Sequence, residues 1–149
     1  MNSRAFRTLI GPCSWTDRSL ISSGLFYPRW ASSAEARLRF YASEFPIVEV
    51  DSSYYAIPSR RTAGLWTERT PPGFTFDIKS YGLFTHHPTA VRSLPGEIRE
   101  ALPQTLRSKA NVYYKDVPQE LKEEAWSSFR EALLPLDSAG KLGVVLFQF

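Results

Sequence analysis

Residues 47–58 read Ile47-Val48-Glu49-Val50-Asp51-Ser52-Ser53-Tyr54-Tyr55-Ala56-Ile57-Pro58. The β-branched residues at the start are typical of a buried strand, and Glu49 and Asp51 are two positions apart, which places them on one face. Carboxylates on one face of an apolar strand are costly unless a partner satisfies them. The stretch therefore predicts a buried strand that carries two acids to the same face of a sheet.

Apolar runs and helical periodicity alternate along the rest of the chain. Residues 74–79 alternate, with Phe74, Phe76 and Ile78 on one face and polar residues on the other. No hairpin signal separates any two of the expected strands, and such an alternation predicts right-handed βαβ units around a parallel sheet. We expect strands at 8–15, 47–58, 74–79 and 140–149. We expect helices at 32–45, with Ser32 or Ser33 as the N-cap, from 62 to the turn near 71–73, and at 118–135, the last ended by Pro135. Residues 16–30 are expected to form a loop and 80–117 a long connection with a short helix near 96–102.

The last expected strand, residues 140–149, is a continuous apolar run of the kind that is buried on both faces of a parallel sheet. Chain termini are usually exposed, so a buried strand in that position is uncommon. We therefore expect that the natural chain continues beyond residue 149.

Composition is that of a globular domain. The chain has 149 residues, 43% of them hydrophobic and 22% charged, enough for one domain over residues 1–149 with its own core. The net charge of +3 permits nucleic-acid binding but does not indicate it, because the basic residues form no block. No apolar run approaches the ~20 residues of a membrane helix, and residues 1–7 lack the apolar core of a secretory leader, which predicts a cytoplasmic protein with no membrane partner.

Several short motifs resemble one known family. In their order along the chain they are Gly11-Pro12-Cys13-Ser14-Trp15, Phe26-Tyr27-Pro28, Phe40-Tyr41-Ala42, Val48-Glu49-Val50-Asp51-Ser52-Ser53-Tyr54-Tyr55, Ile57-Pro58-Ser59, Phe74-Thr75-Phe76-Asp77-Ile78-Lys79, Thr85-His86 and Gly143-Val144-Val145-Leu146-Phe147-Gln148-Phe149. This order is similar to that of the DUF72 family, also called YecE-like. The resemblance implies an eight-stranded TIM-type barrel. It makes this chain the N-terminal half of such an α/β barrel, with four parallel strands and three main helices, incomplete after strand four.

Functional groups of a parallel barrel lie at the C-terminal ends of its strands and in the loops that follow. By this rule the candidate catalytic residues are Glu49, Lys79 and His86. The candidate ligand-binding residues are Ser14, Trp15, Asp51, Tyr54 and Gln148. The resemblance supports six of these, namely Trp15, Glu49, Tyr54, Lys79, His86 and Gln148. In the family Asp51 is more often asparagine and Cys13 more often serine or threonine, which weakens a role for a second carboxylate or a thiol.

Glu49 and Lys79 are the strongest candidates for a pair of interacting functional residues. Adjacent parallel strands lie about 4.8 Å apart, so we expect the two side chains to meet across the sheet. Two interpretations remain open: a general acid/base pair, or an interior ion pair that satisfies only itself. Asp51 is interpreted as a capping or loop-positioning residue.

Other candidates carry less weight. Adjacent His86 and His87 have no metal-ligand spacing, so no metal site is assigned and no cofactor is identified. Cys13 has no neighbouring base in the sequence and is interpreted as a packing residue. Trp66 and Trp126 are expected in the core.

These observations favour an enzyme that acts on a small polar ligand, sugar-like or phosphorylated, at the C-terminal rim. The alternatives are a non-catalytic module that binds a ligand or nucleic acid, and a fragment without function that self-associates through its open sheet edges.

Overall fold

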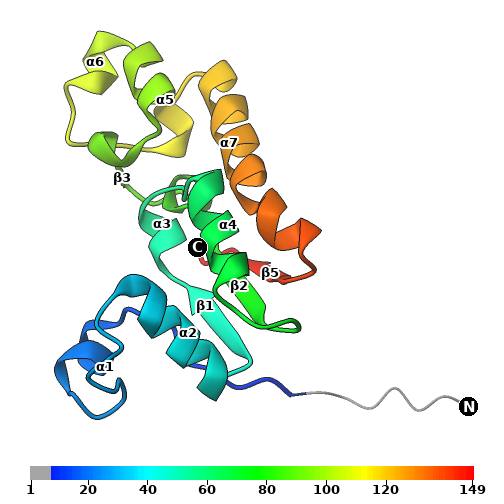
Figure 1. Cartoon of the computed structure of the whole chain (residues 1–149). Helices are drawn as coiled ribbons and strands as arrows, with labels where there is room; N and C mark the ends of the chain where they lie inside the picture. The colour runs from blue at the N-terminus through cyan, green and yellow to red at the C-terminus, as the bar shows by residue number, and fades with distance from the viewer. Residues whose placement is uncertain (1–7) are drawn as a thin grey trace, which may run out of the picture.

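A computed structural model describes residues 8–149 of the chain (Figure 1). Residues 1–7, in which the sequence predicts no leader, lie outside the described part. The elements up to the second strand are α1 (Arg18–Ser22), α2 (Ala34–Glu44), β1 (Ile47–Val50), α3 (Ser52–Tyr55), α4 (Arg60–Glu68) and β2 (Thr75–Lys79). The later elements are η1 (Gly82–Thr85), β3 (Thr89–Ala90), η2 (Val91–Ser93), α5 (Gly96–Ala101), α6 (Gln104–Arg107), β4 (Asn111–Val112), η3 (Tyr114–Asp116), α7 (Gln119–Ser138) and β5 (Leu142–Leu146).

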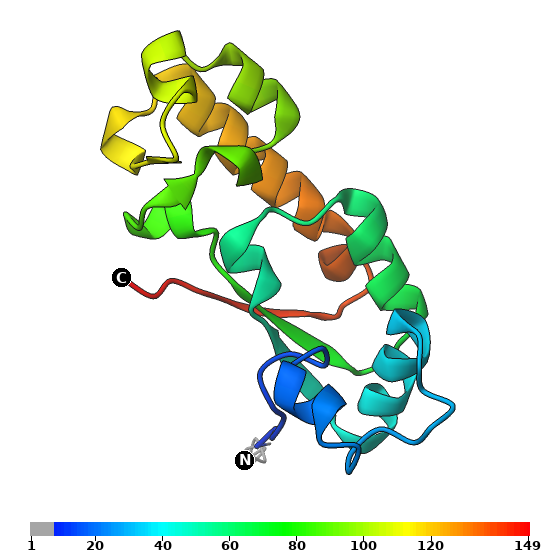
Figure 2. The ribbon, with the colours of Figure 1, turned by 90° about the vertical axis from the view of Figure 1, so that its left-hand side faces the viewer.

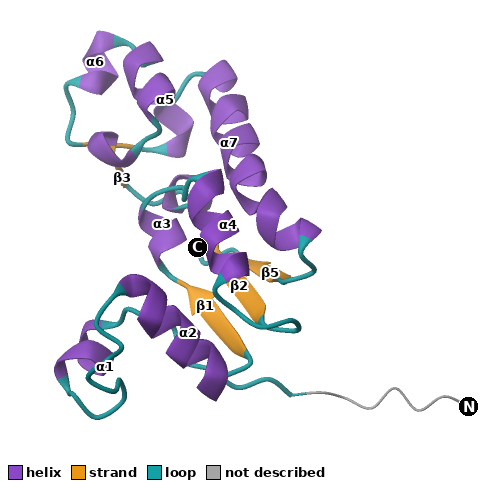
Figure 3. Ribbon diagram, viewed as in Figure 1, coloured by secondary structure: helices purple, strands orange, loops and turns teal. Residues whose placement is uncertain are grey.

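The central sheet is parallel, as the sequence predicts, with the order β1-β2-β5 (Figure 3). It contains three strands where four were expected. Residues 8–15 form no strand and contribute a single parallel bridge from Cys13 to Glu49. Pro12 has no N–H to donate, and Ser14 adopts a left-handed φ of 62°, so an extended ladder cannot continue there.

One face of the sheet is buried and the other is more open. Val48, Val50, Phe76 and Ile78 are at most 1% exposed and belong to the same core as residues of α2, α4 and α7. Helices α4 and α7 lie side by side against the sheet (Figures 1 and 2). The predicted alternation of β2 is therefore confirmed, and its polar positions face away from this core.

Strand β5 is not buried on both faces, contrary to the sequence-based expectation. It forms one edge of the sheet, and Val144 is 60% exposed and Leu146 39%. Phe147 and Phe149 beyond it are also exposed. The strand expected in this apolar run does form, but it pairs with β2 alone among residues 8–149, which leaves its other edge without a strand partner there.

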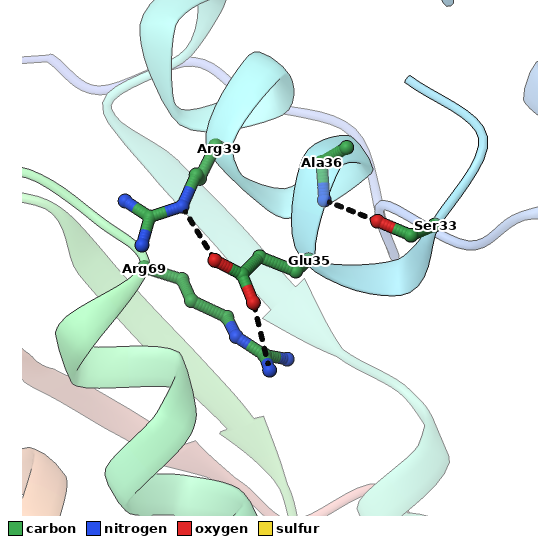
Figure 4. A network of polar contacts seen from close by, with 5 residues as sticks. All are labelled: Ser33, Glu35, Ala36, Arg39 and Arg69. Atoms are coloured by element: carbon green, nitrogen blue, oxygen red, sulfur yellow. Dashed lines mark hydrogen bonds and ion pairs between the residues drawn. The ribbon is translucent and has the colours of Figure 1, made fainter. Parts of the chain in front are cut away.

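Helix α2 has the predicted start and end. The Ser33 hydroxyl accepts a hydrogen bond from the Ala36 amide at 3.0 Å, and Glu35 bonds Arg39 one turn later at 3.0 Å (Figure 4). The other Glu35 oxygen lies 3.2 Å from Arg69, the C-cap of α4. A single carboxylate thus links the first turn of α2 to the end of α4.

Helix α7 continues past Pro135, which was predicted to end it. A proline removes one helical donor, yet the chain remains helical to Ser138. Gly140 then adopts a left-handed φ of 63°, and the Lys141 amide bonds the Leu136 carbonyl at 2.8 Å. Gly140, and not Pro135, therefore ends α7, as glycine does at many helix C-termini.

Residues 82–117 form a lobe, termed here the α5–α6 lobe, at the end of the molecule away from β1 (Figures 1 and 2). The expected short helix is α5. A two-stranded antiparallel ladder, β3 with β4, was not predicted. The lobe packs on the N-terminal half of α7, where Trp126 stacks on Phe84 with 3.7 Å between ring centroids. Trp126 remains 37% exposed and is not the core residue that was expected.

Three further short helices, α1, α3 and α6, were not predicted. Asp17 caps α1 by accepting from the Ser19 amide at 2.8 Å, inside the stretch expected to be a loop. No helix within residues 8–149 is long and apolar enough to cross a membrane.

Candidate functional site

The ends of β1 and β2 bring acidic and basic side chains together. In the register of the two strands Glu49 is opposite Asp77 and Val50 is opposite Ile78. Asp51 follows Val50 and Lys79 follows Ile78, so Asp51 and Lys79 lie opposite one another. The Lys79 ammonium lies 3.4 Å from an Asp51 carboxylate oxygen. The expected Glu49–Lys79 contact is thus wrong, because the register pairs the lysine with the other acid.

Glu49 is held in its protonated form more than an ordinary glutamate. Partial burial raises its pKa most, followed by the negative charge of Asp51 and the hydrogen bond between the two carboxyl groups. Lys79 lowers this pKa to a lesser degree, and Asp77 raises it slightly. The site thus holds the Glu49 carboxyl, whose pKa is raised, beside the Asp51 carboxylate, which is paired with the Lys79 ammonium.

Helix α3 fixes the position of both strand ends. The Ser53 hydroxyl is 1% exposed and lies 2.6 Å from the carbonyl oxygens of Val50 and of Lys79. One side chain therefore bridges the last residues of β1 and β2. The next residue, Tyr54, has its ring centroid 5.5 Å from the Lys79 ammonium, within cation–π range.

Tyr54 also lines a cavity of about 530 Å³ between α3 and the start of the α5–α6 lobe. Its ring approaches Gly82 so closely that a Cβ at that position would lie 3.1 Å from the ring. The His87 ring also contacts Tyr54, with 5.5 Å between the two ring centroids. Tyr54 therefore lies between Lys79 and this cavity, next to a histidine that the sequence analysis did not select.

Cys13 and Ser14 reach the site from the first segment. The Ser14 amide donates to the Glu49 carbonyl at 2.9 Å, which places the Cys13 sulfur beside the acids. The donor atoms of Cys13, Glu49 and Asp51 lie within 4.8 Å of one another. Burial, then Glu49 and Asp51, raises the pKa of the exposed Cys13 thiol.

A thiolate and two carboxylates are donors that Zn²⁺ accepts. Here the Lys79 ammonium lies 3.4 Å from Asp51 and competes with a cation for that carboxylate. We therefore assign no metal ion to the cluster.

The remaining predicted residues do not join this cluster. Trp15 is 7% exposed and packs in the core, with its ring centroid 5.4 Å from that of Trp66. His86 is exposed at a left-handed φ of 64°, and its ring lies near those of Tyr114 and Phe149 rather than near Glu49. Gln148 is exposed beyond β5.

Asp77 is a site residue that the sequence analysis missed. It is opposite Glu49 in the sheet, and its carboxylate accepts a hydrogen bond from the Val144 amide at 2.9 Å. That amide lies where the β2–β5 register shifts between Phe76 and Ile78. The signal was present, because Asp77 shares the period of two with Lys79.

A parallel α/β sheet with polar groups gathered at its C-terminal strand ends defines the class of this protein. Residues 9–149 match the model of the family described as "Protein of unknown function DUF72". The chain belongs to the DUF72 family. It is 32% identical over 140 residues to the UPF0759 protein YunF of Bacillus subtilis (strain 168).

Two crystal structures of a DUF72 family protein from Enterococcus faecalis V583 share the fold, with TM-scores of 0.56 and 0.53 at 24% identity. This chain is covered to 94% in the match to YunF and to 95% in those to the crystal structures. It spans 39% of the length of each of these relatives.

Proposed function

We propose that this chain forms part of the wall of a TIM-type barrel, with β1, β2 and β5 as neighbouring staves. Three features support this. The strands are parallel and joined by helices on one face; the fold is similar to that of a DUF72 chain of which it spans 39%; and β5 exposes an apolar edge that a further strand would cover. In this arrangement Glu49, Asp77 and Lys79 face the barrel interior.

We further propose that the strand ends form part of an active site for proton transfer to a small polar ligand, sugar-like or phosphorylated. The observation that carries the proposal is the pairing of unlike carboxyls: Glu49, whose pKa is raised, beside Asp51, which is bound to Lys79. Environments that separate the pKa values of neighbouring acids are how active sites assign acid and base roles.

Each side chain has a distinct role in this proposal. Glu49 donates a proton to a ligand oxygen, and Asp51 accepts one or orients a hydroxyl group. Lys79 stabilises negative charge that develops on the ligand, and Tyr54 forms a wall on which a sugar ring can stack. Residues from the rest of the barrel would complete the site.

The test is ligand binding to this chain, measured by NMR with a panel of monosaccharides and monosaccharide phosphates. We expect the bound compound to shift the resonances of Glu49 and Tyr54. Glu49→Gln and Lys79→Met should each weaken binding by roughly 10- to 100-fold, the cost of one charge-assisted hydrogen bond.

Glu124→Gln and Lys115→Met change exposed residues of the same types and serve as matched controls. Both should bind as the unchanged chain does. Unaltered binding by Glu49→Gln and Lys79→Met, together with a gain in stability, would show that the cluster is only an interior ion pair.

A further inference from the structure

A second group of charged side chains lies in the α5–α6 lobe, outside the Glu49 site. It surrounds a cavity of about 680 Å³. Four cationic side chains line it, from η2, α5, α6 and the segment before β4: Arg92, Arg99, Arg107 and Lys109. The volume falls in the range of roughly 300–1,000 Å³ that is typical of small-molecule sites.

The charge of this cavity is unbalanced. Glu100 is the only acidic residue in its lining. None of the four cations forms a salt bridge within residues 8–149, whereas Arg39, Arg60, Arg69 and Lys79 do. Like charges that converge on one concave surface repel each other and raise the local concentration of anions.

Two of the arginines are held in place by the backbone of the lobe. Arg99 donates from Nη1 to the Arg92 carbonyl at 3.4 Å, and Arg107 donates from Nη1 to the Glu100 carbonyl at 3.3 Å. The Arg107 Nε also bonds the Gln104 side chain at 3.2 Å. A guanidinium group has five N–H donors, so Arg99 keeps free donors whose planar fork matches phosphate oxygens.

We propose that this cavity binds a small molecule that carries two phosphate groups. A phosphate ester carries about 1.5 to 2 negative charges at pH 7, so two linked phosphates suit a lining with four cations and one carboxylate. Val91 and the alanines beside it offer an apolar surface for the rest of the ligand. All four cations line the same cavity, which suits a compact ligand better than an extended nucleic-acid backbone.

Isothermal titration calorimetry on the 149-residue chain tests this with inorganic pyrophosphate, ADP and adenosine. We expect pyrophosphate and ADP to bind, adenosine to bind far more weakly, and added salt to reduce the affinity. Arg99→Gln and Arg107→Gln should weaken ADP binding by about 10-fold or more. Arg130→Gln, an exposed arginine of α7 outside the cavity, should have no effect.

Lys109→Gln is the decisive variant, because Arg99 and Arg107 also bond carbonyl groups of the lobe. It should weaken ADP binding while leaving the melting temperature unchanged. The two cavities share Ala90, Arg92 and Asn111, but Arg99, Arg107 and Lys109 line only the larger one, so these three variants report on that cavity and not on the one beside Tyr54.

Three results would overturn the proposal. They are no heat of binding with pyrophosphate at low salt, the same ADP affinity in Lys109→Gln as in the unchanged chain, and tighter binding of a single-stranded oligonucleotide than of ADP.

Discussion

Lys141→Met is expected to lower the free energy of unfolding by about 2–4 kcal/mol, because a buried ammonium with several acceptors is lost. Lys141 is 7% exposed, and its Nζ lies 2.7 Å from the Thr67 carbonyl, 2.6 Å from the Thr70 carbonyl and 2.9 Å from the Thr70 hydroxyl. Thr67 is in the last turn of α4, where carbonyl groups lack helical donors and carry partial negative charge, and Thr70 follows the helix. Methionine fills similar space but cannot donate.

Thermal and urea unfolding followed by circular dichroism measure this loss. Roughly 2–4 °C of melting temperature per kcal/mol is expected for a chain of this size, so the midpoint should fall by about 5–15 °C. Lys115→Met, at an exposed lysine, is the control. A change in Lys141→Met within about 0.5 kcal/mol, as at an ordinary surface position, would show that the ammonium does not anchor β5 to α4.

Gly11→Ala is expected to cost about 3 kcal/mol, at the upper end of overpacking substitutions. A Cβ at Gly11 would lie 2.1 Å from the Ile47 carbonyl oxygen and 3.0 Å from its carbon. Both atoms belong to the backbone of β1, so the first segment must move instead. That movement would break the bonds from the Ser14 amide to Glu49 and from the Tyr41 hydroxyl to Pro12, each 2.9 Å.

Unfolding measurements and hydrogen exchange at the Ser14 amide report on this change together. Exchange should accelerate in Gly11→Ala, because the bond to Glu49 is lost. Gly64→Ala is the matched control: nothing lies within 4 Å of its added Cβ, and alanine within α4 should stabilise by about 0.5–1 kcal/mol. If Gly11→Ala has the same Ser14 amide exchange rate and the same free energy of unfolding as the unchanged chain, the close contact of this segment with β1 is contradicted.

Local patterns were sufficient for the elements whose stabilising contacts are local. The period of two in residues 74–79 and the N-cap expected at Ser32 or Ser33 predicted β2 and α2, since alternation and capping act within a few residues. The same reasoning failed for residues 8–15. There an apolar start was followed by Gly-Pro and a residue with positive φ, and the outcome was one bridge instead of a strand.

The partner of Lys79 could not be predicted because it depends on the offset between two strands. Period two places Glu49 and Asp51 on one face, but the β1–β2 connection sets which of them is level with Lys79. The same limit applies to His87, which reaches Tyr54 through the fold of η1 rather than through any sequence spacing. Exposure of β5 likewise follows from its place at the sheet edge, which an apolar run does not reveal.

Partial burial and then the negative charge of Asp51 raise the pKa of Glu49 above its ordinary value. The most direct test is an NMR titration of the Glu49 side-chain carboxyl carbon, in the unchanged chain and in Asp51→Asn. We expect a midpoint above the ordinary value of 4.5 that falls towards it in Asp51→Asn, where the negative charge beside Glu49 is removed and Lys79 no longer has Asp51 to neutralise. A Glu49 midpoint at or below 4.5 that Asp51→Asn leaves unchanged would contradict it.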